Sequence, residues 1–200
     1  MLVSNVEVYG FSESIVASGY PMLSSPPSEE EFSNNTKKYE CQDLIRANKL
    51  ASCKKGEGHD NFLNGIIVQF DLNFTVKAWT EAERYHFLDF VSSMSSMHRI
   101  SKMDFDNVFC SYVTENTKNE MKRLKDIYNA DQTPENYLVL LYNCPVGLQL
   151  TARMTTNYRQ LKTIYSQRKS HRLPEWREFC EWIKTLPYSK EFITTESDNT

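Results

Sequence analysis

The clearest strand signal in the chain is a run of alternating apolar and polar residues that begins after Gly65. Side chains at every second position of a strand share one face, so this run gathers its apolar residues on one side of a sheet. These residues are Ile66, Val68, Phe70, Leu72, Phe74 and Val76. A weaker alternation runs over residues 6–9. We expect the strand after Gly65 to lie centrally in a sheet that has one face on the core.

Helical periodicity dominates the rest of the chain. Thr80, with Glu83 three residues later, has the form of a capping box and predicts a helix that ends at His98 and Arg99. Further helices are expected over residues 114–128, 134–144, 153–168 and 174–183. Two of these carry apolar stripes, made of Leu138, Leu141 and Tyr142 in one and of Trp176, Phe179, Cys180 and Ile183 in the other.

Two segments have the composition of exposed chain. Residues 24–35 are rich in Ser, Pro, Glu and Asn, which predicts a mobile loop, and a short helix around residues 42–50 would follow with Leu44, Ile45 and Leu50 inward. The polar end of the chain predicts fraying. We therefore expect a single domain over residues 1–190, with a mobile insertion near 24–55 and a frayed tail over 191–200.

Composition narrows the class of protein. The 200 residues are 40% hydrophobic and 24% charged, which is typical of one globular domain and excludes disordered and fibrous classes. A net charge of −3 gives no general attraction to nucleic acid. The sequence has no signal peptide pattern and no apolar run long enough to span a membrane, so we expect a soluble, cytoplasmic protein. Its five scattered cysteines, without a CxxC pair, indicate reduced thiols rather than disulfides or zinc.

Common catalytic motifs are missing. Gly56 and Gly58 begin like a dinucleotide fingerprint, but Asn61 stands at the third glycine position and a strand follows instead of a helix. The sequence contains no phosphate-binding loop and no zinc-peptidase, hydrolase or deaminase motif. The chemistry must therefore be sought in less standard clusters.

Three polar clusters remain as candidates for a site. They are the turn with His59 and Asn61, the pair His98 and Arg99, and the group of Arg153, Asn157, Arg159 and Arg168. Eleven residues are close to three helical turns, so Asn157 and Arg168 would lie nearly in line on one helix. Guanidinium and amide groups in such a row suit phosphates and the edges of a flavin or a base. Each cluster also has a structural interpretation, as a turn, a helix end or a solvated basic face.

In this order the clusters resemble the flavin-dependent thymidylate synthases. In that family a Gly-His element precedes a Phe-x-Phe strand, as Gly58-His59 does here. The family's Arg-His-Arg signature corresponds to Met97-His98-Arg99. Its closing Asn-Ala-Arg-Ser-Leu and Leu-Arg elements correspond to Asn157-Tyr158-Arg159-Gln160-Leu161 and to Gln167-Arg168, with Trp176 after them.

The resemblance implies an α/β (α+β) fold with a central, mostly antiparallel sheet flanked by helices, assembled as a homotetramer with active sites between subunits. It implies FAD-dependent transfer of a methylene group from methylene-tetrahydrofolate to dUMP or a related pyrimidine nucleotide, with NADPH as reductant. By position, the flavin would be held by His59, Asn61, His98, Arg99, Asn157 and Arg159. The nucleotide would be held by Arg153 and Arg168, and Arg168 would be the catalytic residue that polarises the pyrimidine.

Departures from the family pattern keep other functions open. Met97 replaces the first arginine of the signature, and Leu141 stands where the family has an arginine for the nucleotide. The positions after Arg99 that would hold the phosphate and sugar of dUMP are also changed. One alternative is a nucleotide-binding or sequestering protein on the same fold, without turnover or with altered specificity. The second is an interaction protein with no small-molecule ligand.

Overall fold

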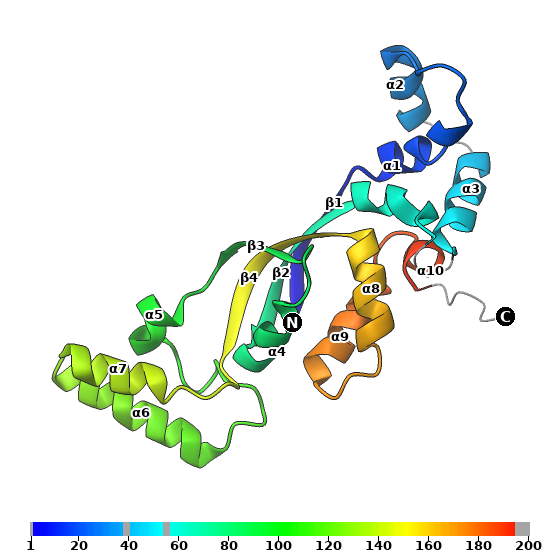
Figure 1. Ribbon diagram of the computed structural model, residues 1–200. Helices are drawn as coiled ribbons and strands as arrows, with labels where there is room; N and C mark the ends of the chain where they lie inside the picture. Colours follow the sequence, from blue (N-terminus) through cyan, green and yellow to red (C-terminus); the bar gives the residue numbers. More distant parts are fainter. Residues whose placement is uncertain (1, 38–40, 54–56, 195–200) are drawn as a thin grey trace.

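The computed structural model describes residues 2–37, 41–53 and 57–194 (Figure 1). Its core is a four-stranded antiparallel sheet with the order β1-β2-β4-β3. The strands are β1 (Val3–Tyr9), β2 (Ile67–Thr75), β3 (Asp89–Ser93) and β4 (Gln149–Asn157). Strands β2 and β4 pair along their whole length, from Ile67 opposite Asn157 to Thr75 opposite Gln149. This confirms the predicted fold class and the central position of the strand after Gly65.

Helices pack at both ends of this sheet (Figure 1). The α-helices are α1 (Phe11–Ala17), α2 (Glu29–Lys37), α3 (Cys41–Ala51), α4 (Val76–Ala82), α5 (Ser96–Arg99), α6 (Glu115–Ala130), α7 (Pro134–Tyr142), α8 (Tyr158–Arg168), α9 (Pro174–Ile183) and α10 (Ser189–Phe192). The short 3-10 helices within the described ranges are η1 (Tyr20–Met22), η2 (His59–Gly65) and η3 (Ile100–Lys102). Among the described residues, no helix is both long and apolar enough to cross a membrane.

Two hydrophobic clusters lie at different places along the sheet. The larger one joins the apolar face of β2 to α8 and α9, where Phe74 packs edge-on against Trp176 with ring centroids 5.0 Å apart. The smaller one lies between α6, α7 and η3 and includes Met121 and Leu140. Val68, Phe70, Leu72 and Phe74 of β2 are fully buried, as the alternation predicts. Val76, which the alternation also includes, instead begins α4 and is half-buried. The stripe predicted for α9 is also buried and is therefore confirmed.

The helix predicted from Thr80 to Arg99 is wrong. Helix α4 begins earlier, because the hydroxyl of Thr75 accepts the N–H of Ala78 at 3.1 Å, and it ends at Ala82. The hydroxyl of Thr80 instead donates to the carbonyl of Lys77. The following residues form β3, an edge strand paired with β4, and only the short α5 carries His98 and Arg99. Pairing with a strand some 60 residues later overrides the local capping signal.

The helix predicted over residues 153–168 also needs correction. Arg153 lies in strand β4, and the helix begins only at Tyr158, after Asn157. Arg153 is therefore not one turn before Asn157 on a common helix. Residues 149–157 alternate in burial, and their register with β2 fixes them as a strand.

The loop predicted over residues 24–35 is only partly correct. From Glu29 the chain is helical, because Ser28 and Glu31 form a capping box in which each side chain accepts the other's backbone N–H. The helix expected around residues 42–50 is confirmed as α3, although Ile45 is exposed and the buried residues of α3 are Ala47 and Ala51.

Two smaller predictions differ from the structure in detail. Helix α7 buries Leu140, whereas Leu138 and Tyr142 of the predicted stripe are exposed. The tail predicted from residue 191 begins too early, since Phe192 and Ile193 are buried in the larger core. Residues 195–200 lie outside the described residues, as do parts of the predicted insertion near 24–55.

Candidate functional site

The junction of β4 and α8 brings together four of the predicted cofactor residues. Asn157 caps α8, because its side-chain Oδ1 accepts the backbone N–H of Gln160 at 2.8 Å. Helix η2 packs against α8 and carries His59 and Asn61, both exposed. Arg159 follows in the first turn of α8. This corner of the molecule therefore collects an amide, an imidazole and a guanidinium from two segments about 100 residues apart in the chain.

Asp60 ties this corner together. Its buried carboxylate lies 3.2 Å from Nε of Arg159 and 2.9 Å from Nζ of Lys162. Lys162 also donates to the carbonyl of Ala51, so helices α3, α8 and η2 meet at one ammonium group. The side chain of Arg159 is 38% exposed, and its ion pair with Asp60 engages Nε. Asp60 thus holds the guanidinium of Arg159 at Nε on a partly exposed side chain.

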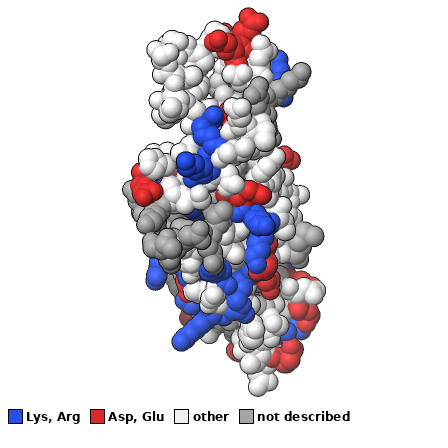
Figure 2. Space-filling model, turned by 90° about the vertical axis from the view of Figure 1, so that its right-hand side faces the viewer, with Lys and Arg blue, Asp and Glu red and all other residues white. Residues whose placement is uncertain are grey.

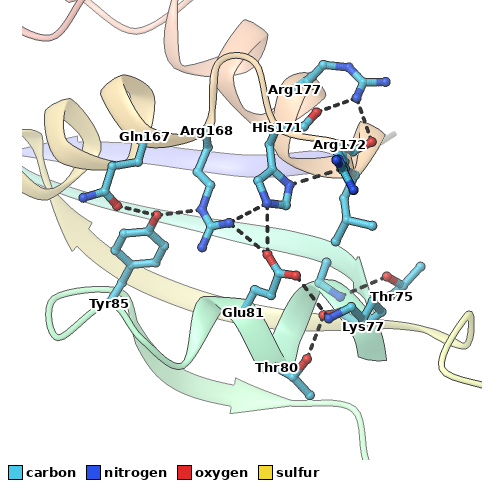
Figure 3. A network of polar contacts seen from close by, with 12 residues as sticks. Thr75, Lys77, Thr80, Glu81, Tyr85, Gln167, Arg168, His171, Arg172 and Arg177 are labelled. Carbon is cyan, nitrogen blue, oxygen red and sulfur yellow. Dashed lines mark hydrogen bonds and ion pairs between the residues drawn. The ribbon is translucent and has the colours of Figure 1, made fainter.

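Arg168 lies at the opposite end of α8, within a polar network (Figure 3). Its Nη1 donates to Oε2 of Glu81 at 2.8 Å, and its Nε donates to the hydroxyl of Tyr85 at 2.8 Å. The guanidinium carbon lies 4.8 Å from the centroid of the Trp176 ring, and the side chain is only 12% exposed. Figure 3 shows Arg168 between Tyr85 and His171, facing Glu81 on α4. The network joins α4, α8 and the start of α9.

His171 belongs to the same network. Its Nδ1 accepts the backbone N–H of Leu173 at 3.2 Å, and its Nε2 lies 2.7 Å from Nη1 of Arg168 and 3.2 Å from Oε2 of Glu81. Burial lowers the pKa of His171, and the charge of Arg168 lowers it further, while Glu81 opposes them. Burial raises the pKa of Glu81, but the hydrogen bond from Lys77 and the nearby positive charges bring it below its usual value. Glu81 is therefore a carboxylate beside a neutral imidazole at pH 7.

Arg153 is separated from this network. On β4 its Nη1 donates to the carbonyl of Asn5 at 2.6 Å and to Oδ1 of Asp71 at 3.3 Å. The amide of Asn5 also donates to Asp71, which is the main reason why the pKa of that carboxyl is lowered. Arg153 thus joins β4 to β2 and β1, and the structure does not bring it to Arg168.

His98 and Arg99 lie on the short helix α5, far from α8 (Figure 1). The hydroxyl of Tyr137 on α7 donates to the carbonyl of Met97 and fastens this helix to the smaller core. Because β3 and β4 are antiparallel, with Ser93 opposite Ala152, α5 begins beyond Ala152 and away from Asn157. Five residues of strand already separate these levels by about 16 Å. One chain alone therefore does not place His98 and Arg99 beside Asn157 and Arg159.

Positive charge gathers on the face that includes α8 and α9 despite the negative net charge of the chain (Figure 2). Lys and Arg side chains cluster in the lower half of this view. The partners that organise two of these cations, Asp60 and Glu81, were not predicted from the sequence. The only local signal for Glu81 is its spacing of four residues from Lys77, with which it pairs at 3.1 Å.

Two thiols, those of Cys144 and Cys180, are poor candidates for nucleophiles. Burial raises the pKa of Cys144 to about 11, and burial is also the main cause that raises the pKa of Cys180 to about 11. A thiol with such a pKa is protonated at neutral pH and reacts slowly. This supports the interpretation of these cysteines as packing residues.

Comparison by sequence finds no matching family model and no matching curated protein. Comparison of folds does find relatives. The flavin-dependent thymidylate synthase ThyX from Helicobacter pylori, complexed with FAD and dUMP, matches with a TM-score of 0.71 at 15% identity, over 96% of this chain and 97% of that chain. A second structure of that protein with the same two ligands matches with a TM-score of 0.72 at 14% identity, over 98% and 100% of the two chains.

A third match extends the range of activities found on this fold. The UMP/dUMP methylase PolB from Streptomyces cacaoi, bound with 5-Br dUMP, has a TM-score of 0.62 at 13% identity, over 96% of this chain and 94% of that chain. The chain therefore has the fold of the flavin-dependent thymidylate synthases over nearly its whole length. The resemblance first seen in its motifs is confirmed at the level of the fold.

Proposed function

We propose that this protein methylates dUMP or a related pyrimidine nucleotide in an FAD-dependent reaction, with methylene-tetrahydrofolate as the carbon donor and NADPH as the reductant. The observation that carries the proposal is the corner at which β4 meets α8. There Asn157 and Arg159 lie beside the turn with His59 and Asn61, on a fold whose solved relatives are complexed with FAD and dUMP. PolB supports the broader substrate range, since it is a methylase of UMP and dUMP.

The residues at this corner fit a flavin. Arg159 is partly exposed while Asp60 holds its Nε, and the amide nitrogen of Asn157 is not used by the helix cap. Planar donors of this kind suit the phosphates and ring edge of FAD. The flavin supplies the hydride chemistry when it is bound. Arg168 would donate a hydrogen bond to the pyrimidine and stabilise negative charge that develops on its ring.

A complete site would need more than one copy of the chain. His98 and Arg99 are exposed at the far end of the sheet, and the nearby segment exposes Phe90, Val91 and Met94 on and after the edge strand β3. Exposed apolar side chains on an open strand edge favour association. We therefore propose a homo-oligomer, a tetramer by resemblance, in which α5 of one copy meets α8 of another. A cytoplasmic location accords with this small-molecule chemistry.

The absorbance spectrum of the purified protein, recorded with and without added FAD and followed by gel filtration, tests the proposal. We expect flavin absorbance to elute with the protein and to be lost in the Arg159→Ala variant. Arg177→Ala is the matched control, because Arg177 donates to the carbonyls of His171 and Arg172 in the turn before α9 and lies outside the flavin corner. A wild-type protein that elutes without flavin after incubation with FAD would exclude the flavin-dependent reaction.

A nucleotide-binding protein without turnover is the second candidate. It is favoured because Arg168 already donates hydrogen bonds to Glu81 and Tyr85. Fewer of its N–H groups are therefore available to a substrate. This candidate predicts a thermal shift with a pyrimidine nucleotide and none with FAD. At a ligand concentration of about 100 times its dissociation constant, the shift would correspond to about 2.7 kcal/mol of stabilisation.

A further inference from the structure

Glu81 supplies an internal counter-charge to Arg168, and it does so from helix α4. The carboxylate lies 2.8 Å from Nη1 of Arg168, and the side chains of both residues are more than four-fifths buried. Lys77 reaches the other oxygen of the same carboxylate at 3.1 Å from one turn earlier. Glu81 therefore stays ionised and holds the guanidinium in place. The position of Arg168 depends on a residue 87 positions earlier in the chain.

The contacts of Arg168 also determine which hydrogen bonds it can still donate. A guanidinium has two edges on which two nitrogens point in parallel, one with Nε and Nη2 and the other with Nη1 and Nη2. Nε donates to Tyr85, and Nη1 donates to Glu81 and also lies 2.7 Å from Nε2 of His171. On each edge, one nitrogen therefore already donates a hydrogen bond within the protein. Neither edge can form the two parallel hydrogen bonds by which a guanidinium binds a phosphate or carboxylate group. The remaining nitrogen, Nη2, suits a single acceptor oxygen.

Charge favours the same kind of acceptor. Glu81 places a negative charge 2.8 Å from Nη1 of Arg168, so a phosphate group approaching the guanidinium would also meet this carboxylate at close range and be repelled. Lys77 pairs with the other oxygen of Glu81 from a side chain that is 51% exposed, where water screens its charge. A neutral ring carbonyl carries no such penalty. The guanidinium also lies over the ring of Trp176, in surroundings where such charge effects are stronger than in water.

We propose that Glu81 is a positioning residue that fixes Arg168 and makes it select an uncharged carbonyl edge of a pyrimidine ring over a phosphate group. The inference rests on the proposed function and adds to it the residue that sets the specificity of this arginine. Tyr85 also helps to fix Arg168, because its hydroxyl oxygen accepts the hydrogen bond from Nε of Arg168. The hydroxyl proton of Tyr85 is donated to Gln167 at 2.9 Å.

Titration calorimetry with two probes tests this inference. The probes are deoxyuridine, which has the ring without a phosphate, and inorganic phosphate. In Glu81→Gln the affinity for deoxyuridine should fall about tenfold, the loss expected when a charge-assisted contact no longer holds the donor. The affinity for phosphate should rise, because the guanidinium is no longer neutralised.

Glu83→Gln is the control, since Glu83 is exposed next to the same helix and its substitution changes the net charge by the same amount. It should leave both affinities at their wild-type values. Tyr85→Phe provides a second variant that keeps the packed ring, and it should shift both affinities in the same directions by smaller factors. Thermal unfolding of each variant verifies that it is folded.

The outcomes separate this inference from the proposed function. If wild-type protein binds deoxyuridine and dUMP and neither Glu81→Gln nor Tyr85→Phe changes the preference between the two probes, the inference is wrong and the function stands. If the variants weaken both probes equally, Glu81 has a structural role only and the inference is again wrong. If the wild-type protein binds no pyrimidine, the proposed function fails and the inference with it.

Discussion

The arginines on helix α8 and the arginine at the α5 end of the sheet differ in whether they are paired with a carboxylate. Along α8 Arg159 faces Asp60 in the first turn and Arg168 faces Glu81 of α4 in the last turn, and both carboxylates are at most 17% exposed. At the α5 end Arg99 is exposed, and within the described part of the chain its guanidinium has no hydrogen bond or ion pair. The α8 end is thus ordered by the chain itself. The α5 end offers free cationic groups that suit a ligand or a second copy.

Because of this difference, the paired arginines and the unpaired arginine should contribute to different properties, the first to stability and the second to binding. An arginine paired with a buried carboxylate contributes to the fold, and removing its partner leaves an uncompensated charge. An exposed, unpaired arginine contributes little to the fold and is available for recognition. Substitutions at the two ends should therefore have different consequences, and the following experiments test that contrast from the largest effect to the smallest.

Removing the carboxylate at the α8 end should have the largest effect on stability. Asp60→Asn leaves Arg159 and Lys162 without their shared counter-ion, and we expect the free energy of unfolding to fall by about 2–3 kcal/mol. Urea unfolding followed by circular dichroism measures this loss. Asp106→Asn, which removes an exposed partner of Lys122, is the control and should change little. Equal stability of the two variants would contradict the contrast.

Removing the free arginine at the α5 end should affect binding without affecting stability. In Arg99→Ala we expect an unchanged unfolding midpoint and an affinity for FAD that is lower by about tenfold or more. Fluorescence titration of FAD measures the affinity. Lys102→Ala removes an exposed cation three residues away and should leave FAD binding intact. A loss of stability in Arg99→Ala, or equal losses of affinity in both variants, would show that Arg99 has no special role.

The network around Arg168 should make stability depend on pH. The pKa of His171 is lower in the folded protein than its unfolded value of 6.5, so the unfolded chain takes up a proton first as the pH falls. The contribution of His171 to stability is therefore complete above pH 6.5 and declines as the pH drops below that value. His171→Asn keeps an acceptor for Leu173 and cannot be protonated. Its unfolding free energy should fall less than that of wild type between pH 7 and pH 5.5, and identical slopes would contradict this role.

The sequence predicted best those elements whose signal is local. The alternation of β2 and the stripe of α9 extend over neighbouring residues, and both are buried as expected. Thr114 and Thr133 likewise cap α6 and α7 with their hydroxyls, as the helix boundaries there suggested. In contrast, β3 was mistaken for helix because its pairing partner β4 lies some 60 residues later.

The candidate site was predicted only in its residue types. The row of Asn157, Arg159 and Arg168 does lie along α8, with Asn157 at its cap. The partners that order this row, Asp60 and Glu81, come from segments about 90 to 100 residues away, and no local pattern reveals such contacts. The local pattern also places Arg153 on the same helix, which is wrong. The change from strand to helix at Asn157 depends on the pairing of β4 with the distant strand β2.

The claim that the two ends of the sheet form one site across copies has a direct test. Arg99→Ala and Arg159→Ala each remove one half of the proposed flavin site, and each variant alone should fail to retain FAD. When the two are co-expressed and assemble at random, about a quarter of the sites would combine an intact α5 with an intact α8 and should bind FAD. Recovery of bound flavin near that fraction is the predicted result. Co-assembled oligomers without flavin, while wild-type protein retains it, would contradict the account.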